Sequence, residues 1–482
     1  MTDRIRRLGV ILGVGFCLLL AALTRIQVLE ASSLTNDPRN TRGLTAAFSA
    51  DRGFIQTSDG VVLARSSPSD DEFKRQREYP EGALFAPITG YLSFTFGAEG
   101  AERAFNSDLI GGALPKGDAS LRDLFDSKRR VGDVTLTINA AVQRVAAAAL
   151  GNRRGAVVAL DPSTGAVLAM VSFPTFDPTP LAGHKQDGVR AAWDALQNDP
   201  AHPLLPRPYR ESYAPGSTFK VVTASAAFDH APDLTTKSYP TLRQLDLPRT
   251  DKDLPNFGGN SCGGVIADLL RVSCNTGFAQ MGIDLGGKNL ADEAGAFGFN
   301  EKPPFDLPAA ATSHFPDAGE FDRNEPGMAF SAIGQQNVTA TPLQMALVAA
   351  AIGNGGVIMA PHVLGQVKDE RENVIRTFTP HEWRRATSAA TADAVRAMMI
   401  DVAARGTATR ARVNGATVAA KTGTAQTIGN NAHAWLIAFA PAEAPKVAVA
   451  VIVESQPGLG DVTGGRIAAP IAAQVMQAAL GL

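Results

Sequence analysis

Three short motifs contain residue types that could together carry out nucleophilic catalysis. The first runs from Ser217 to Lys220 and follows a Pro-Gly pair. A Pro-Gly turn before an apolar run predicts that Ser217 lies at the start of a helix, and on a helix Lys220 shares its face. A serine hydroxyl is a weak nucleophile and needs an adjacent base. A lysine can be that base only if burial or another cation lowers its pKa. Because apolar residues flank Lys220, we expect it not to be simply solvated.

The second motif is Ser273-Cys274-Asn275. Helical patterns flank it, so we expect a loop between two helices. In such a loop the Ser273 hydroxyl can relay a proton and the Asn275 amide can hold a substrate amide.

The third motif is Lys421-Thr422-Gly423-Thr424, which follows a predicted strand over 416–420. Gly423 lets another backbone come close, and a strand edge can bind an extended peptide. An ammonium beside two hydroxyls suits a carboxylate. Taken singly, each of the three motifs also fits a solvated helix, a polar turn or a strand end.

The order of the motifs favours the catalytic interpretation over these structural ones. Ser-x-x-Lys, Ser-x-Asn and Lys-Thr-Gly follow one another along the chain, and together they resemble the set that marks penicillin-binding proteins. The similarity to class B penicillin-binding proteins extends to residues 155–170, 331–361 and 421–441, and the length is closest to the short form of that class. The resemblance implies an α/β (α+β) fold of the β-lactamase/transpeptidase type. Its antiparallel sheet is flanked by helices and carries an all-helical subdomain.

The resemblance also implies a role for each motif residue. By matching position, Ser217 is the acylated nucleophile, Lys220 its general base and Ser273 a proton shuttle. Substrate contacts fall to Asn275, Lys421, Thr422, Gly423 and Thr424, and Lys421 also closes the proton network. The backbone amides of Ser217 and Thr424 form the oxyanion hole, and the chemistry uses no metal ion or other cofactor.

The implied reaction is D,D-transpeptidation of peptidoglycan. A stem peptide ending in D-Ala-D-Ala loses its last residue to form an acyl-enzyme, which a neighbouring stem amine attacks, and β-lactams inhibit covalently. A D,D-carboxypeptidase, a β-lactamase or β-lactam sensor, and an inactive cell-wall scaffold remain alternatives. The region ahead of the catalytic domain shows no paired carboxylates typical of a glycosyltransferase, so the family implies a separate membrane glycosyltransferase as partner.

The elements that must position these motifs follow from the apolar pattern. We expect strands over 156–160, 166–171, 435–440 and 447–453, with helices between, so that one sheet is assembled from both ends of the domain. A hairpin around Asp59-Gly60 and a short helix before Gly112 indicate a non-catalytic pedestal. The predicted domains are a pedestal over 30–135 and a transpeptidase domain over 136–482.

The N-terminus predicts a membrane anchor. Arg4, Arg6 and Arg7 precede an uncharged stretch over 8–24, which partly resumes after Arg25. We predict a cytoplasmic segment over 1–7, a single transmembrane span over 8–29 and an extracytoplasmic remainder, because basic residues stay on the cytoplasmic side. A cleaved signal peptide is the alternative, but the small-x-small cleavage pattern around Ala31 is poor.

Composition narrows the remaining possibilities. The 482 residues carry a formal net charge of -2, which gives no indication of a nucleic-acid partner. Cys262 and Cys274 either pair in an oxidising compartment or stay as buried thiols, and both alternatives remain open. Two glycine-rich stretches mimic known motifs by chance: 259–263 lacks the strand that a hydrolase elbow needs, and 282–289 lacks the hydroxyl of a P-loop and is better interpreted as a helix C-terminus.

Overall fold

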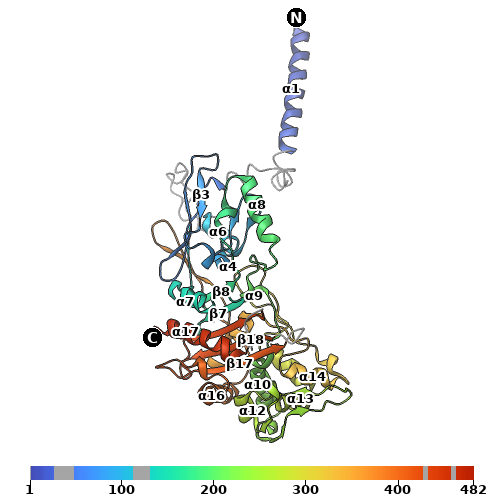
Figure 1. Cartoon of the computed structure of the whole chain (residues 1–482). Coiled ribbons are helices and arrows are strands. Elements are labelled where there is room, and N and C mark those ends of the chain that lie inside the picture. Colours follow the sequence, from blue (N-terminus) through green and yellow to red (C-terminus); the bar gives the residue numbers. More distant parts are fainter. Residues whose placement is uncertain (1, 26–47, 112–130, 427–431, 457–462) are drawn as a thin grey trace. The chain divides into compact units, whose positions relative to one another are not determined.

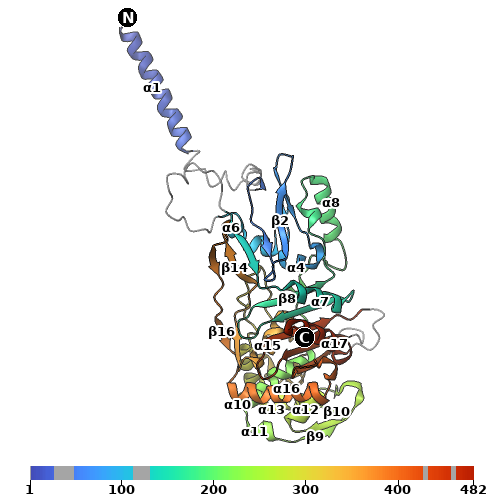
Figure 2. The same cartoon turned by 90° about the vertical axis from the view of Figure 1, so that its left-hand side faces the viewer.

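The computed structural model describes residues 2–25, 48–111, 131–426, 432–456 and 463–482. The chain divides into two compact units, one of residues 1–51 with 67–76 and one of residues 52–66 with 77–482. Figures 1 and 2 show the elements from two directions.

The smaller unit contains one long helix, α1 (Thr2–Thr24). Its window Arg7–Thr24 is long and apolar enough to cross a membrane, and none of that window is buried. Residues 26–29 of the predicted span lie outside the described residues. The helix has the character of a membrane anchor or of a signal sequence.

A six-stranded sheet of order β15-β14-β6-β1-β2-β3 begins after α1 in the chain. The predicted hairpin is confirmed, because β1 and β2 pair antiparallel around Asp59-Gly60. β6 pairs parallel with β1, and the β14–β15 hairpin comes from the second half of the chain. The strands are β1 (Ile55–Gln56), β2 (Val62–Pro68), β3 (Arg75–Glu78), β6 (Asp133–Leu136), β14 (Leu364–Lys368) and β15 (Val374–Thr377). Small elements beside them are α4 (Ala86–Thr89), β4 (Leu92–Ser93), β5 (Gly97–Ala98), α5 (Gly100–Ala104) and α6 (Asn106–Leu109).

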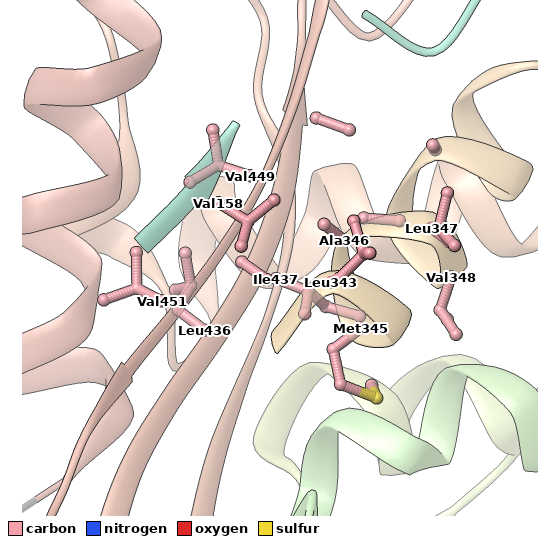
Figure 3. Close-up of a cluster of buried hydrophobic side chains, with 14 of the residues drawn as sticks. Val158, Leu343, Met345, Ala346, Leu347, Val348, Leu436, Ile437, Val449 and Val451 are labelled. Carbon is pink, nitrogen blue, oxygen red and sulfur yellow. The ribbon is translucent and has the colours of Figure 1, made fainter. Parts of the chain in front are cut away.

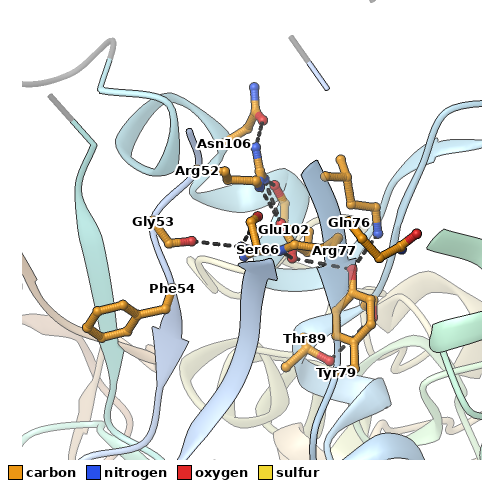
Figure 4. A network of polar contacts seen from close by, with 12 residues as sticks. Arg52, Gly53, Phe54, Ser66, Gln76, Arg77, Tyr79, Thr89, Glu102 and Asn106 are labelled. Carbon is orange, nitrogen blue, oxygen red and sulfur yellow. Dashed lines mark hydrogen bonds and ion pairs between the residues drawn. The ribbon is translucent and has the colours of Figure 1, made fainter. Parts of the chain in front are cut away.

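A buried carboxylate links separate segments of this N-terminal region through hydrogen bonds. Glu102 of α5 is fully buried and accepts hydrogen bonds from Arg52 Nε (2.8 Å) and Arg77 Nε (2.6 Å), as Figure 4 shows. Burial alone would raise the pKa of Glu102, but the two guanidinium groups outweigh it and the pKa is lowered. The carboxylate therefore stays charged, and breaking such a buried network by removing one partner typically costs about 3–5 kcal/mol.

The part of the chain after residue 154 centres on a five-stranded antiparallel sheet of order β17-β18-β19-β7-β8. Its strands are β7 (Gly155–Leu160), β8 (Val167–Phe173), β17 (Ala419–Gln426), β18 (Ala432–Ala440) and β19 (Val447–Val453). The predicted assembly from both ends of the domain is confirmed. The strand predicted over 416–420 begins later and continues through the Lys421 motif, because β17 pairs with β18 along its whole length.

Helices cover both faces of this sheet. α7 (Ala140–Leu150) and α17 (Ala469–Leu480) pack together on one face, and α15 (Pro342–Gly353) packs on the other. Figure 3 shows Leu343 and Ala346 of α15 facing Ile437 of β18. All of these side chains are fully buried, and burying a leucine or isoleucine contributes about 1.5–3 kcal/mol. The expected covering of both sheet faces is therefore found.

A largely helical subdomain follows the nucleophile motif. Its main helices are α10 (Lys220–His230), α11 (Asp233–Thr236), α12 (Ile266–Val272), α13 (Asn275–Ala296) and α14 (Glu325–Ala332). Two small ribbons interrupt it, built from β9 (Tyr239–Leu242), β10 (Gln244–Leu245), β11 (Leu254–Pro255) and β12 (Cys262–Gly264). Within α13 the helical path breaks at Gly286 (φ 79°), where the sequence indicated a helix end. The remaining elements are α8 (Gln186–Gln197), α9 (Arg207–Arg210), β13 (Val357–Met359), β16 (Glu382–Arg385) and α16 (Ala389–Arg405).

Candidate active site

The three motifs converge on one cleft in the larger unit. The cleft has a volume of about 1040 Å³ and lies between β17, the α12–α13 loop and the start of α10. Six of the eight sequence-predicted site residues line it: Ser217, Ser273, Asn275, Thr422, Gly423 and Thr424. The other two, Lys220 and Lys421, are fully buried next to it. The structure therefore brings all of the predicted site residues together.

Ser217 lies on a tightly held turn. A 3-10 helix, η4 (Gly216–Phe219), runs directly into α10, so the predicted helix start is confirmed. Gly216 has a φ of 54°, and a Cβ atom there would lie 3.1 Å from the Thr424 carbonyl oxygen. Its amide donates a hydrogen bond to the carbonyl of Gly334 (2.8 Å). Glycine adopts this backbone without strain, and it lets the residue before Ser217 pack closely against Thr424 and Ala425 of β17.

Lys220 has the environment of a neutral amine. Its Nζ donates to the Ser273 carbonyl (2.8 Å) and to Asn275 Oδ1 (2.7 Å). Burial, and after it the charge of Lys421, holds the pKa of Lys220 well below 10.5. Among the described residues, Nζ forms no hydrogen bond to Ser217 Oγ. Catalytic hydrogen bonds often tighten only when substrate binds.

Lys421 connects the strand to the loop opposite. Its Nζ donates to Ser273 Oγ (2.8 Å) and to the Thr422 carbonyl (2.8 Å). Burial lowers the pKa of Lys421 to about 7. Ser273 is therefore bonded by Lys220 at its carbonyl and by Lys421 at its hydroxyl, which links the two buried lysines through one residue.

The loop that carries Ser273 is fixed by contacts from distant parts of the subdomain. Ser273 itself ends α12 in the left-handed conformation (φ 60°), and the expected loop between two helices is confirmed. Cys262 and Cys274 form a disulfide, which decides between the two alternatives left open by the sequence. The bridge ties β12 to the residue between Ser273 and Asn275.

Asn256 lines the cleft and bonds the loop that carries Ser273, and the sequence pattern did not reveal it. Its side chain, 6% exposed, accepts hydrogen bonds from the amides of Asn275 (2.9 Å) and Thr276 (3.0 Å) at the start of α13. Its own amide donates to the Leu242 carbonyl (2.8 Å). The N-cap residue of α13, Cys274, offers no side-chain cap, so Asn256 supplies one from 19 residues upstream. Only a local Ser, Thr, Asp or Asn would have signalled such a cap.

Thr422 and Thr424 place hydroxyl groups along the free edge of the sheet. β17 is an edge strand, and the Thr422 hydroxyl lies 2.6 Å from that of Thr407. At Gly423, a Cβ atom would lie 3.0 Å from the Pro215 carbonyl oxygen, so glycine permits the close approach of the nucleophile turn. An extended ligand could add to this edge with its carboxylate next to the hydroxyls.

Comparison with known proteins identifies the architecture. Residues 155–477 match the model of the penicillin-binding protein transpeptidase domain. The chain belongs to the penicillin-binding protein transpeptidase family. Residues 52–134 match the penicillin-binding protein A dimerisation domain, so this transpeptidase carries that domain at its N-terminal side.

Relatives of this penicillin-binding protein cover its whole length. The peptidoglycan D,D-transpeptidase PbpA of Mycolicibacterium smegmatis is 40% identical, over 100% of this chain and 99% of the relative. The protein of the same name from Mycobacterium tuberculosis is 38% identical over the same shares. Class B and the short form indicated by the sequence are thereby confirmed.

Solved structures agree with the fold. Penicillin-binding protein A from M. tuberculosis, as a ceftriaxone acyl-enzyme complex, matches with a TM-score of 0.84 and 36% identity over 90% of this chain and 100% of that chain. Its penicillin G acyl-enzyme complex matches with a TM-score of 0.82 and 37% identity over 89% of this chain and 100% of that chain. The transpeptidase fold predicted from the motifs is confirmed.

Proposed function

We propose that this chain is a peptidoglycan D,D-transpeptidase in which Ser217 forms the acyl-enzyme. The single observation that carries the proposal is the pair of buried lysines that meet at Ser273 beside the Ser217 turn. Burial disfavours a charged ammonium group, so two buried lysines close together favour the neutral amine form. Strongly shifted pKa values of this kind are typical of catalytic sites. The names of the full-length relatives support the same reaction.

Lys220 is suited to take the proton of Ser217. A neutral amine has two N–H groups and one lone pair, and both N–H groups are used by the Ser273 carbonyl and Asn275 Oδ1. The lone pair is then free to accept the Ser217 proton as Oγ attacks the scissile carbonyl. The developing oxyanion would be stabilised by the amides of Ser217 and Thr424, and one such donor is typically worth about 100- to 1000-fold in rate.

Ser273 is suited to deliver a proton to the leaving amine. Its hydroxyl oxygen accepts from Lys421, which leaves the hydroxyl proton available to donate. As the C–N bond breaks, this proton passes to the departing D-Ala amine, and the lysines replace it. Asn275 would hold the donor backbone, while Thr422, Gly423 and Thr424 would hold its terminal carboxylate. β-Lactams acylate the same serine, and nothing in this scheme requires a metal ion or cofactor.

The D,D-carboxypeptidase alternative differs only in the acceptor. Incubating the purified chain with a donor peptide ending in D-Ala-D-Ala and a second stem peptide with a free amine separates the two by mass spectrometry. Transpeptidation predicts a cross-linked dimer with loss of one D-Ala. Release of D-Ala without any dimer would favour the carboxypeptidase, and no release with either peptide would favour a sensor or a scaffold.

We also infer that α1 is an uncleaved anchor with residues 1–7 in the cytoplasm and the catalytic domain outside. The arginines before the apolar stretch support this orientation. The proposed pedestal over 30–135 and transpeptidase domain over 136–482 enclose the two matched segments. We also propose that glycan strands come from a separate membrane glycosyltransferase, as the family resemblance implies. N-terminal sequencing of the membrane-bound protein tests the anchor, since a mature protein that begins after residue 25 would contradict it.

A further inference from the structure

The segment that leads to Ser217 is held to two other parts of the chain. Tyr213 exchanges two backbone hydrogen bonds with Ala340, at 3.0 Å and 2.8 Å. The Ala214 carbonyl accepts a hydrogen bond from Nε1 of Trp435 (3.0 Å), a fully buried residue of β18. These contacts fix the backbone just before the nucleophile turn.

The Tyr213 side chain adds a buried contact to the end of the catalytic sheet. Its hydroxyl donates a hydrogen bond to Glu454 Oε1 (2.8 Å), and Glu454 directly follows the last residue of β19. Tyr213 and Glu454 are each 8% exposed. Burial, and after it the charge of Glu454, raises the pKa of Tyr213, so the phenol keeps its proton and stays a hydrogen-bond donor.

Glu454 is itself held in place by two arginines. Arg207 Nε donates to Oε1 (2.9 Å), and Arg154 Nη2 lies 3.0 Å from Oε2. Arg207 is 1% exposed, and its Nη atoms donate to the carbonyls of Ala201 (2.7 Å) and His202 (3.2 Å). Charge-assisted hydrogen bonds of this kind are strong and fix geometry. The Tyr213 hydroxyl is therefore tied to a carboxylate that has little freedom to move.

This pair lies outside the cleft. Neither Tyr213 nor Glu454 is among the described residues that line it. Tyr213 is four positions before Ser217, so the pair can affect the reaction through the position of the nucleophile turn. A nucleophile must be held close to its attacking geometry, and a misplacement of about 1 Å can cost about 100-fold in rate.

We propose that the hydrogen bond between Tyr213 and Glu454 positions Ser217 for its attack, with Tyr213 as a positioning residue and Glu454 as its anchor. The bond sets where the chain enters the nucleophile turn, whereas Lys220 and Ser273 move the protons. Its loss should slow the covalent step and leave the binding of the ligand unchanged. This inference rests on the proposed function, because it takes Ser217 as the attacking group.

The test removes the phenol hydroxyl alone. Tyr213→Phe keeps the aromatic ring and both arginine contacts of Glu454. The matched control is Tyr239→Phe: Tyr239 is also buried and donates to a carboxylate, Asp284 Oδ2 (3.1 Å), but it is not among the described residues that line the cleft. Stopped-flow acylation of the whole chain at several concentrations of a fluorescent penicillin gives the dissociation constant of the non-covalent complex and the first-order acylation constant separately. Thermal unfolding is followed on the same preparations.

We expect Tyr213→Phe to lower the first-order acylation constant about tenfold, as a shift of less than 1 Å implies, and to leave the dissociation constant unchanged. Each variant loses a buried hydrogen bond to a carboxylate, so the midpoint of thermal unfolding should fall in both. Tyr239→Phe should nevertheless acylate at the parental rate.

Three results would overturn the positioning role: a parental acylation constant in Tyr213→Phe, an equal loss in Tyr239→Phe, or an effect confined to the dissociation constant. If the parent chain is not acylated at all, the proposed function itself fails.

Discussion

Replacing Asn256 should disturb the position of the loop that carries Ser273 without removing any residue that takes part in the reaction. In Asn256→Ala, the Asn275 and Thr276 amides lose their acceptor and the Leu242 carbonyl loses a donor. Thr276 is buried, so its amide cannot recruit water easily. An unsatisfied buried group costs about 1–3 kcal/mol and a lost helix cap about 1 kcal/mol, so we expect a loss of about 2–4 kcal/mol in unfolding free energy.

The same change should slow acylation. Asn275 Oδ1 holds Lys220, and Ser273 links both lysines, so a shift of the loop displaces the proton network. A misplacement of about 1 Å can cost about 100-fold in rate, and the disulfide through Cys274 should limit the shift. We therefore expect acylation by a fluorescent penicillin to slow by about 10- to 100-fold.

Asn256→Asp serves as the matched control. It keeps the acceptor oxygen for both amides, but it loses the donor to the Leu242 carbonyl and to Thr276 Oγ1 (3.3 Å). Its stability and acylation rate should therefore lie between those of the parent chain and the alanine variant. Acylation and unfolding are measured on the same preparations. An alanine variant that is less stable but acylates at the parental rate would refute the positioning role. An alanine variant with parental stability and parental acylation rate would refute the expected cost of losing these hydrogen bonds.

Three further predictions concern other parts of the molecule. Lys421→Met removes the charge that is the second cause of the lowered Lys220 pKa, so the pKa of Lys220 should rise. In a pH–rate profile, the acidic limb of the residual acylation rate should then move to higher pH. Replacing both Cys262 and Cys274 by serine opens a bridge that spans 12 positions, which should cost about 3 kcal/mol in urea unfolding, whereas retention of the parental stability would contradict this estimate. Glu102→Gln should destabilise the N-terminal sheet by about 3–5 kcal/mol and leave the acylation rate of the folded protein unchanged, and a variant as stable as the parent would contradict the buried network.

Local pattern was enough to predict the parts of the fold in which short-range preference and burial agree. The strand over 447–453 was predicted with the bounds that the structure has, because it is a continuous apolar run. Ser217 and Lys220 could be placed together because a helix fixes residues three apart on one face.

The features that sequence did not reveal depend on contacts between distant segments. β14 joins the sheet of β6, although more than 200 residues separate them, and no local pattern specifies that pairing. β17 extends through the Lys421 motif because β18 pairs with it. Asn256 lies in a glycine-containing loop that resembles an ordinary turn, and only the folded chain brings it to the cleft.

The measurement that tests the central claim most directly is penicillin labelling followed by peptide mass spectrometry. The account predicts one covalent adduct on the peptide that contains Ser217, no adduct in Ser217→Ala, and a sharply reduced rate in Lys220→Ala. Parental labelling of the Ser217→Ala protein, or an adduct on any other residue, would contradict it.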